Sequence, residues 1–322
     1  MKASTGEYKY EAGAHKPEYE TTAMFGSNLL NDNVESIIKI NDICNRYGLD
    51  TISAGGTIAF TIECYENGIL TRKDTDGLEM TWGNTKSIVA MTEKMAKREG
   101  FGDIIADGTK KAAERIGKGS AKYAMHAGGQ EFGAHDPRGG PGFAIGYGAE
   151  ATPGRHTMSG EGPPAPPGMM IEPPGFNRKS FKGRGEYHKR GACIREVYNS
   201  AGICMLVFGD GYGHIDLFVE AMRTITGWDV TMDELLKTGE RIYNMRLSFN
   251  AREGLKAPFE FPDRMMGKPP KKVGPRAGII LNKDEMFNEY LTAMGVDLDT
   301  GKPGKQRLRE LGLGDVVEVL WK

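Results

Sequence analysis

Apolar side chains recur at helical spacing along most of the chain. After Asn33, the residues Ile37, Ile38 and Ile43 fall on one face, which is the pattern of an amphipathic helix. Asn33 is a preferred N-cap residue and Gly48 a preferred terminator, so a capped helix is predicted between them. Similar patterns predict helices over 55–67, 84–99, 102–116, 188–200, 216–226, 231–251, 284–294 and 306–320. Alternating strand patterns are few, so the predicted fold class is mainly α.

Two tracts interrupt this helical pattern. Residues 126–156 are rich in glycine, and residues 162–176 are rich in proline. Stretches of this length without regular periodicity are uncommon in a compact domain unless they carry a function. We place a domain boundary at the start of the first tract, which predicts two helical domains with long glycine-rich loops, over residues 1–125 and 126–322.

Composition narrows the class of protein. The 322 residues include 42 lysines and arginines against 43 aspartates and glutamates, a net charge of -1, which argues against a polybasic nucleic-acid binder. Glycine accounts for 45 residues, about twice its average share of roughly 7%. This excess indicates sharp turns or close backbone approach at many places.

The expected compartment is the cytoplasm. Four cysteines in 322 residues exclude a disulfide scaffold and favour a reducing environment. No apolar run approaches the roughly 20 residues of a membrane span, and the polar first residues do not form a signal peptide. We therefore expect contact with neither nucleic acid nor membrane.

A short motif occurs twice, each time after a predicted helix. The copies are residues 45–50 (NRYGLD) and 199–204 (NSAGIC). Taken singly, Gly48 and Gly202 are ordinary helix terminators. Their repetition with the same flanking chemistry indicates two helix ends that contact one ligand. A polar side chain followed by backbone amides freed by glycine suits a planar heterocycle rich in donors and acceptors.

The residues around these motifs resemble the aldehyde ferredoxin oxidoreductase family of tungsten or molybdenum pterin enzymes. Residues 16–20 (KPEYE) are similar to its Pro-Glu-Tyr-Glu segment, and residues 48–53 (GLDTIS) to its Gly-Leu-Asp-Thr-Ile-Ser segment. Four further similar segments follow in the family's order: 82–85, 96–102, 136–139 and 239–242. The resemblance covers essentially the whole chain and implies the fold of that family's second and third domains.

The resemblance implies a tungstopterin or molybdopterin cofactor, which the family holds with a repeated Asp-x-x-Gly-Leu-Asp/Cys motif. The matching positions in this chain are Asn45, Gly48, Leu49, Asp50, Asn199, Gly202 and Ile203. Both copies begin with asparagine where the family commonly has aspartate. An asparagine can accept a hydrogen bond, but it lacks the charge that strengthens such a bond.

The resemblance also implies a 4Fe-4S cluster, with Cys204 as one ligand. Such clusters are bound by four thiolates, and the family draws the other three from an upstream Cys-x-x-Cys-x-x-x-Cys run. Cys44, Cys64 and Cys193 lack that spacing, so we expect them to be small buried side chains. In the family the run precedes the segment matched by Met1. We therefore expect two domains of a three-domain enzyme, incomplete and inactive alone.

Three residues are candidates for catalysis through the resemblance. Glu20 matches a glutamate that faces the metal in the family, and a carboxylate in a dry pocket can exchange a proton with substrate or water. His156 ends the glycine-rich tract, where the family has a histidine near the metal, and it could donate a hydrogen bond to a carbonyl oxygen. Tyr19 could add a phenolic donor.

The activity implied by the resemblance is oxidation of an aldehyde to a carboxylate, with ferredoxin as the electron acceptor. A second interpretation is a tungsten-dependent reductase of an aromatic acyl-thioester, with the same cofactors. A third is a noncatalytic fragment or subunit that requires a separate cofactor-bearing partner. Expected partners are ferredoxin, a small aldehyde and the missing N-terminal domain, and homodimer formation stays open. The tract at 162–176 is expected to shape the substrate entrance.

Overall fold

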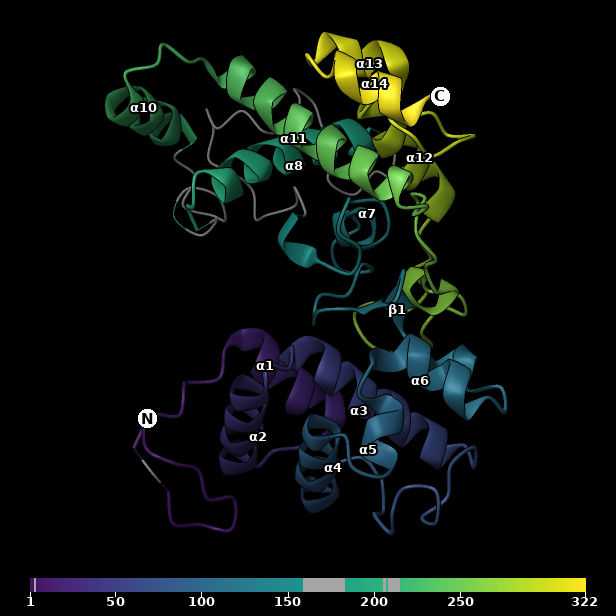
Figure 1. The fold of residues 1–322 in the computed structure, drawn as a ribbon. Helices are drawn as coiled ribbons and strands as arrows, with labels where there is room; N and C mark the ends of the chain where they lie inside the picture. Colours follow the sequence, from purple (N-terminus) through teal and green to yellow (C-terminus); the bar gives the residue numbers. More distant parts are fainter. Residues whose placement is uncertain (3, 159–182, 205–206, 208–214) are drawn as a thin grey trace. The chain divides into compact units, whose positions relative to one another are not determined.

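The computed structural model describes residues 1–2, 4–158, 183–204, 207 and 215–322 (Figure 1). The chain forms two compact units, Met1–Ala134 and His135–Lys322. The fold is mainly α, as the sequence predicts, and the strands of the described residues form one two-stranded antiparallel hairpin. None of the described helices is both long and apolar enough to cross a membrane.

The first unit is a group of helices around the apolar helix α3. Its elements are α1 (Tyr19–Phe25), η1 (Ser27–Leu29), α2 (Val34–Tyr47), α3 (Thr51–Glu66), α4 (Thr85–Lys97), α5 (Phe101–Ile105), α6 (Gly108–Ile116), η2 (Ser120–Tyr123), β1 (His126–Ala127) and β2 (Gln130–Glu131). Ile58 and Ile62 of α3 are fully buried in one core with Ile40 of α2 and Met91 of α4. Burying such side chains contributes about 1.5–3 kcal/mol each.

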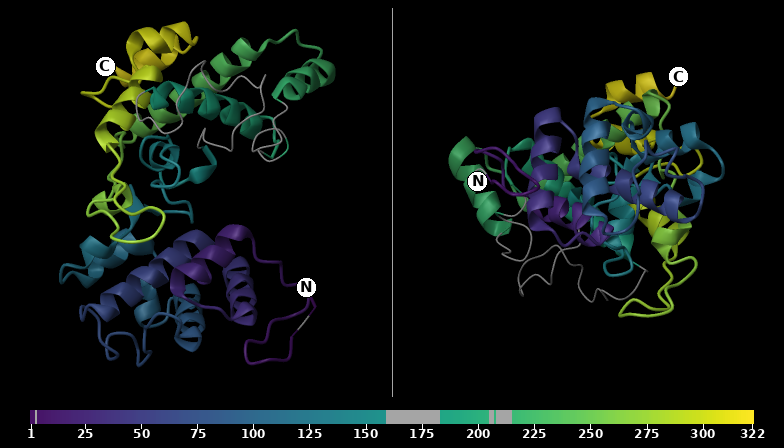
Figure 2. Two further views of the ribbon diagram at one scale, coloured as in Figure 1. Left: turned by 180° about the vertical axis from the view of Figure 1, so that it is seen from behind. Right: turned by 90° about the horizontal axis from the view of Figure 1, so that it is seen from below.

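The second unit is built around α8. Its elements are α7 (Gly142–Gly148), η3 (His156–Met158), α8 (Arg184–Ser200), α10 (Ile215–Thr226), α11 (Met232–Arg252), η4 (Asp263–Met266), α12 (Lys283–Ala293), α13 (Lys305–Glu310) and α14 (Gly314–Leu320). Helix α8 packs along α11 and α12, and the left view of Figure 2 shows these helices side by side. A Cβ on Gly239 would lie 1.9 Å from the carbonyl oxygen of Cys193. Glycine at this crossing therefore lets α8 and α11 approach closely.

The predicted start holds for two helices whose N-cap residue the sequence identifies, whereas α3 begins at Thr51, earlier than the predicted residue 55. The Asn33 side chain accepts a hydrogen bond of 2.9 Å from the Ser36 amide at the start of α2. Gly48 follows the last residue of that helix with φ 70°. Asn84 caps α4 in the same way, accepting from the Ser87 amide at 3.3 Å. These caps satisfy backbone groups that a helix end leaves without a partner.

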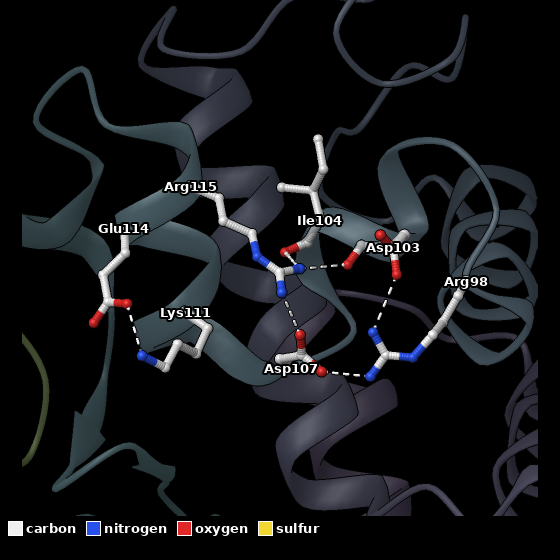
Figure 3. Close-up of polar contacts among 7 residues, drawn as sticks. All are labelled: Arg98, Asp103, Ile104, Asp107, Lys111, Glu114 and Arg115. Carbon is white, nitrogen blue, oxygen red and sulfur yellow. Dashed lines mark hydrogen bonds and ion pairs between the residues drawn. The ribbon is translucent and has the colours of Figure 1, made fainter.

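The helix predicted over 102–116 is instead two helices, α5 and α6. Gly108 has φ 86°, which a continuous α-helix cannot accommodate. Arg115 reaches across the break and donates to the carbonyl oxygens of Asp103 at 2.8 Å and Ile104 at 3.3 Å. Figure 3 shows Asp107 between the guanidinium groups of Arg98 and Arg115. The break is thus stabilised by contacts to carbonyls that α5 leaves free.

The two units meet in sequence at Ala134 and His135, later than the boundary expected at residue 126. The hairpin formed by β1 and β2 belongs to the first unit. Its Gln130 donates to Ser53 of α3 at 3.1 Å, and its buried Glu131 accepts from the Thr109 amide of α6 at 2.6 Å. Side-chain bonds to α3 and α6 therefore place residues 126–134 with the helices that precede them.

Candidate functional site

The first motif forms the junction between α2 and α3. The amides of Gly48 and Leu49 both donate to the carbonyl of Cys44, the second at 2.8 Å. Asp50 then caps α3, because its carboxylate accepts from the Ile52 amide at 2.7 Å and from Ser53 at 3.4 Å. The turn is a helix C-terminus closed by a left-handed glycine and followed at once by an N-cap.

The second motif forms the same kind of turn at the end of α8. Gly202 has φ 71°. The amide of Ile203 donates to the carbonyl of Tyr198 at 2.9 Å, five residues earlier. Ile203 packs on the core of the second unit, while Asn199 and Cys204 are exposed. The motif therefore partly buries its apolar position and leaves its polar ones on the surface.

The two copies share one backbone geometry. In this geometry the backbone amides after each helix are not available in the way that the sequence analysis expects. The amides after each helix were expected to be freed for a ligand. Leu49 and Ile203 instead donate to carbonyls of their own helices, as does Gly48. The described residues thus leave the side chains, rather than these amides, to contact a ligand.

Glu20 and Tyr19 lie at the start of α1 and contact the last residue of the first unit. The Glu20 carboxylate accepts a hydrogen bond of 2.8 Å from the Ala134 amide. The Tyr19 hydroxyl lies 3.5 Å from the Ala134 carbonyl, although its side chain is 63% exposed. Next along α1, the hydroxyl of Thr21 contacts that of Thr51 at 2.8 Å. Thr51 follows Asp50, so this contact brings Glu20 and the first motif into one region of the unit.

His156 lies in η3 of the second unit, half-buried, and its ring stacks on that of His135. The ring centroids are 4.4 Å apart and the planes differ by 14°. His135 belongs to the glycine-rich tract but was not among the predicted site residues. No periodicity marks it, because the contact joins a residue outside regular structure to the first residue of η3, 21 residues later. Element η3 also packs on α8, the helix that ends at the second motif.

The chain leading to His156 is held by neighbouring helices over residues 149–152. The hydrogen bonds run from Tyr243 to the Ala149 carbonyl (3.0 Å), from Tyr290 to the Glu150 carboxylate (2.6 Å), from Asn250 to the Ala151 carbonyl (2.6 Å) and from Arg246 to the Thr152 hydroxyl. Glu150 is fully buried and also lies 3.1 Å from the ring of His188 in α8. Such a paired, bonded carboxylate avoids much of the cost of burial.

Burial divides the four cysteines, and the three expected to be buried are buried. Cys44, Cys64 and Cys193 are buried, and Cys204 is exposed. Burial raises the pKa of the Cys44 and Cys64 thiols to about 12, and it raises the pKa of Cys193 as well. A thiol in such surroundings is a poor metal ligand, since the thiolate is the form that binds. Of the four, Cys204 is the one whose side chain is exposed.

A separate cavity of about 420 Å³ lies among α11, α14 and residues 151–152 of the second unit. Its walls are largely apolar, with Phe249 and Val319 among them. None of the predicted site residues belongs to the described residues that line it. The proline-rich tract at 162–176, expected to shape the substrate entrance, lies outside the described residues.

Each of the two motif turns has open space beside its glycine and exposed polar groups next to it. A Cβ placed on Gly48 or Gly202 would meet no atom within 4 Å, so the backbone has open space at both turns. Asn45 and Asp50 present an exposed amide and an exposed carboxylate beside the first turn, and Cys204 an exposed thiol beside the second. This donor set suits the amide-like edges of a pterin and an iron site.

Comparison with protein families matches residues 1–313 to the family described as aldehyde ferredoxin oxidoreductase, domains 2 and 3. Among curated relatives, the chain is 34% identical to the tungsten-containing aldehyde ferredoxin oxidoreductases of Pyrococcus horikoshii and Pyrococcus abyssi. These alignments cover 92% and 94% of this chain but only 48% and 49% of the relatives. The chain thus spans about half their length. An aliphatic sulfonate oxidoreductase, WOR-like subunit, of Pyrococcus furiosus is 28% identical over 93% of this chain and 46% of that relative.

A solved structure shares the fold. It is the active-site complex BamBC of benzoyl coenzyme A reductase with 1,5-dienoyl-CoA, with a TM-score of 0.74 at 22% identity. The superposition covers 96% of this chain and 51% of that one. The family match extends over nearly the whole chain, and the chain belongs to the aldehyde ferredoxin oxidoreductase family.

Proposed function

We propose that the chain forms the second and third domains of a cytoplasmic tungsten or molybdenum pterin enzyme that oxidises an aldehyde to a carboxylate. The aldehyde and one water give a carboxylic acid, two protons and two electrons, and the electrons pass singly to ferredoxin. The observation that carries this proposal is the shared turn of the two motifs, with an exposed cysteine ending the second. The 34% identity to tungsten-containing relatives supports it.

The motif residues would hold the cofactors. The pterin would contact Asn45, Gly48, Leu49, Asp50, Asn199, Gly202 and Ile203, and the cluster would take Cys204 as one ligand. When bound, the metal pterin and the 4Fe-4S cluster would supply the redox chemistry. The remaining cluster ligands and a further pterin-binding surface would come from the other half of the family's polypeptide.

Glu20 would accept a proton released from water or from substrate. Its carboxylate has one oxygen bonded to the Ala134 amide, which restricts the rotation of the side chain and directs the proton-accepting edge. General acid–base catalysis of this kind contributes roughly 10²–10⁴-fold in rate. Tyr19 precedes it on α1 and would add a phenolic donor.

His156 would donate a hydrogen bond to the carbonyl oxygen of the aldehyde. A donor aimed at an oxygen that gains negative charge stabilises the transition state more than the substrate. The hydrogen bonds to residues 149–152 support this proposal, because they fix the chain that leads to the histidine.

Two alternative functions assign different roles to the chain. A tungsten-dependent reductase of an aromatic acyl-thioester would use the same cofactor residues with another pocket. The likeness to benzoyl coenzyme A reductase at 22% identity concerns the fold alone, so it does not favour this activity. A noncatalytic chain would serve only as a partner of a separate cofactor-bearing subunit.

The test is anaerobic isolation of the native protein with every polypeptide that co-purifies. Tungsten, molybdenum, iron and sulfide are measured, and the preparation is assayed with aldehydes and ferredoxin and, separately, with aromatic acyl-thioesters. Aldehyde-dependent reduction of ferredoxin supports the proposal. Activity with acyl-thioesters alone would favour the second interpretation, and metal-free protein without either activity the third. An in-frame Cys-x-x-Cys-x-x-x-Cys in the upstream DNA would identify one continuous enzyme.

A further inference from the structure

Four rings of the second unit contact one another in succession, from Tyr147 to His156. The centroids of Tyr147 and Phe143 are 6.4 Å apart, those of Phe143 and His135 are 4.9 Å apart, and those of His135 and His156 are 4.4 Å apart. The last pair is close to parallel, with 14° between the planes. Offset stacking at this separation is a favourable aromatic arrangement. One face of the His156 ring thus stacks on the ring of His135.

Both ends of this histidine pair are tied to one buried residue. The Tyr147 side chain is fully buried, and its hydroxyl donates to the His135 carbonyl at 3.1 Å. The Tyr147 carbonyl accepts from the Gly154 amide at 2.9 Å, two residues before His156. The backbone on either side of the stacked rings is therefore fixed relative to the same point.

The chain after His135 is held as well. The Asp136 carboxylate accepts from the guanidinium of Arg138 at 2.8 Å and lies 3.1 Å from that of Arg276. Burial raises the pKa of Asp136, but the hydrogen bonds from Arg138 outweigh it, so the net pKa lies below its usual value. Asp136 is charged at neutral pH. Its ion pairs with Arg138 and Arg276 fix the backbone on the C-terminal side of His135.

We propose that His135 is a positioning residue that fixes the plane of the His156 imidazole. The ring nitrogens of a histidine donate and accept in the plane of the ring. A parallel partner at 4.4 Å blocks rotation of that plane, so the hydrogen bond from His156 is confined to one narrow set of directions. This inference rests on the proposed function only in giving His156 a substrate oxygen to orient; the stacking itself does not depend on it.

The test uses NMR of the 322-residue chain with isotope-labelled histidine, and His156→Gln assigns the His156 signals. In the unchanged chain, the ring protons of His156 are expected to be shifted upfield by the His135 ring current. His135→Ala should abolish that shift, and His135→Phe should retain it, because phenylalanine keeps the ring and loses the nitrogens. His135→Gln, which has no ring, gives the same discrimination where the alanine variant does not fold.

Activity provides the second measurement, made in the isolated native enzyme. His135→Gln should lower kcat with little change in KM, and His135→Phe should restore most of kcat. His156 signals that do not change in His135→Gln would overturn the positioning role, even in an enzyme that oxidises aldehydes. Loss of the upfield shift in His135→Gln but not His135→Phe would support it, even where aldehyde oxidation is absent and the proposed function fails.

Discussion

The amide of Ile203 donates to the carbonyl of Tyr198 at 2.9 Å, across the left-handed residue Gly202. Leu49 makes the equivalent bond to Cys44 at 2.8 Å in the other unit. Two segments that belong to separate compact units therefore fold their copies of the six-residue motif into the same turn. The turn depends on the glycine, since other residues reach positive φ only at a cost.

Replacing the motif glycines by alanine should destabilise the protein through the backbone alone. Gly48 and Gly202 have φ of 70° and 71°, and a Cβ at either site meets no atom within 4 Å. Gly48→Ala and Gly202→Ala should each cost about 1–2 kcal/mol, measured by urea unfolding followed by circular dichroism. Gly314→Ala is the matched control, because it also has open space and lacks a positive φ. An equal effect in the control would contradict the strain argument.

Asp50 should stabilise the cofactor-free protein by capping the N-terminus of α3. Its carboxylate accepts from two amides of the first turn of α3, so Asp50→Ala should lower the free energy of unfolding by about 1 kcal/mol. Asp50→Asn retains an acceptor oxygen and should lose much less. A thermal melt of the cofactor-free chain compares the two variants, and identical melting temperatures would rule out the capping contribution.

Glu20→Gln tests the proposed proton transfer. In the native enzyme this change should lower turnover by roughly 10²–10⁴-fold, while tungsten and iron contents stay constant. Glutamine keeps an oxygen that can accept from the Ala134 amide, so the fold should persist. Glu18→Gln, at an exposed position two residues earlier, should leave turnover unchanged. Unaltered turnover in Glu20→Gln would end this assignment.

Thiol labelling should separate one cysteine from three. Burial raises the pKa of Cys44 and Cys64 to about 12, so at pH 8 the thiolate fraction of each is about one ten-thousandth. Cys204 is exposed, so iodoacetamide should modify one cysteine of the folded, metal-free chain quickly. The slow cysteines should speed up about tenfold for each pH unit while the fold persists. Cys204→Ser should remove the fast reaction; a fast reaction that survives would show that another thiol is accessible.

The buried carboxylate of Glu150 should depend on its tyrosine partner. The Tyr290 hydroxyl donates to it at 2.6 Å, and both side chains are fully buried. Tyr290→Phe should cost about 1–3 kcal/mol, because a buried acceptor loses a donor. Tyr47→Phe, at a side chain 51% exposed, should be close to neutral. Urea unfolding monitored by circular dichroism compares them, and equal stability of both variants would show that Glu150 does not need this bond.

Sequence periodicity predicted most helices but missed α7. Its sequence, GFAIGYG, contains three glycines, and glycine is the poorest helix former after proline. The helix is stabilised by packing, since Ala144, Ile145 and Tyr147 are fully buried. Gly148 is needed for that packing, because a Cβ there would lie 2.4 Å from the ring of Phe287. Tertiary contacts of this kind leave no periodic signal in the sequence.

The sequence predicted only those parts of the candidate site that belong to a recognisable sequence motif. The turns at Gly48 and Gly202 agree with the sequence expectation of glycine-terminated helices, whereas the role of Cys204 as a cluster ligand stays a prediction. The stacking of His135 on His156 could not be inferred, because it depends on how two loops fold back on α7. The break between α5 and α6 was missed because Gly108 sits inside an otherwise regular helical pattern.

The hydrogen bonds to residues 149–152 have a consequence for how this family can vary. Each of the four residues is fixed by a different side chain of α11 or α12, upstream of the proline-rich tract at 162–176. Changes in the length or composition of that tract can therefore accumulate without shifting the backbone that carries His156. Under the proposed function, such an arrangement would let the substrate entrance change while His156 keeps its position.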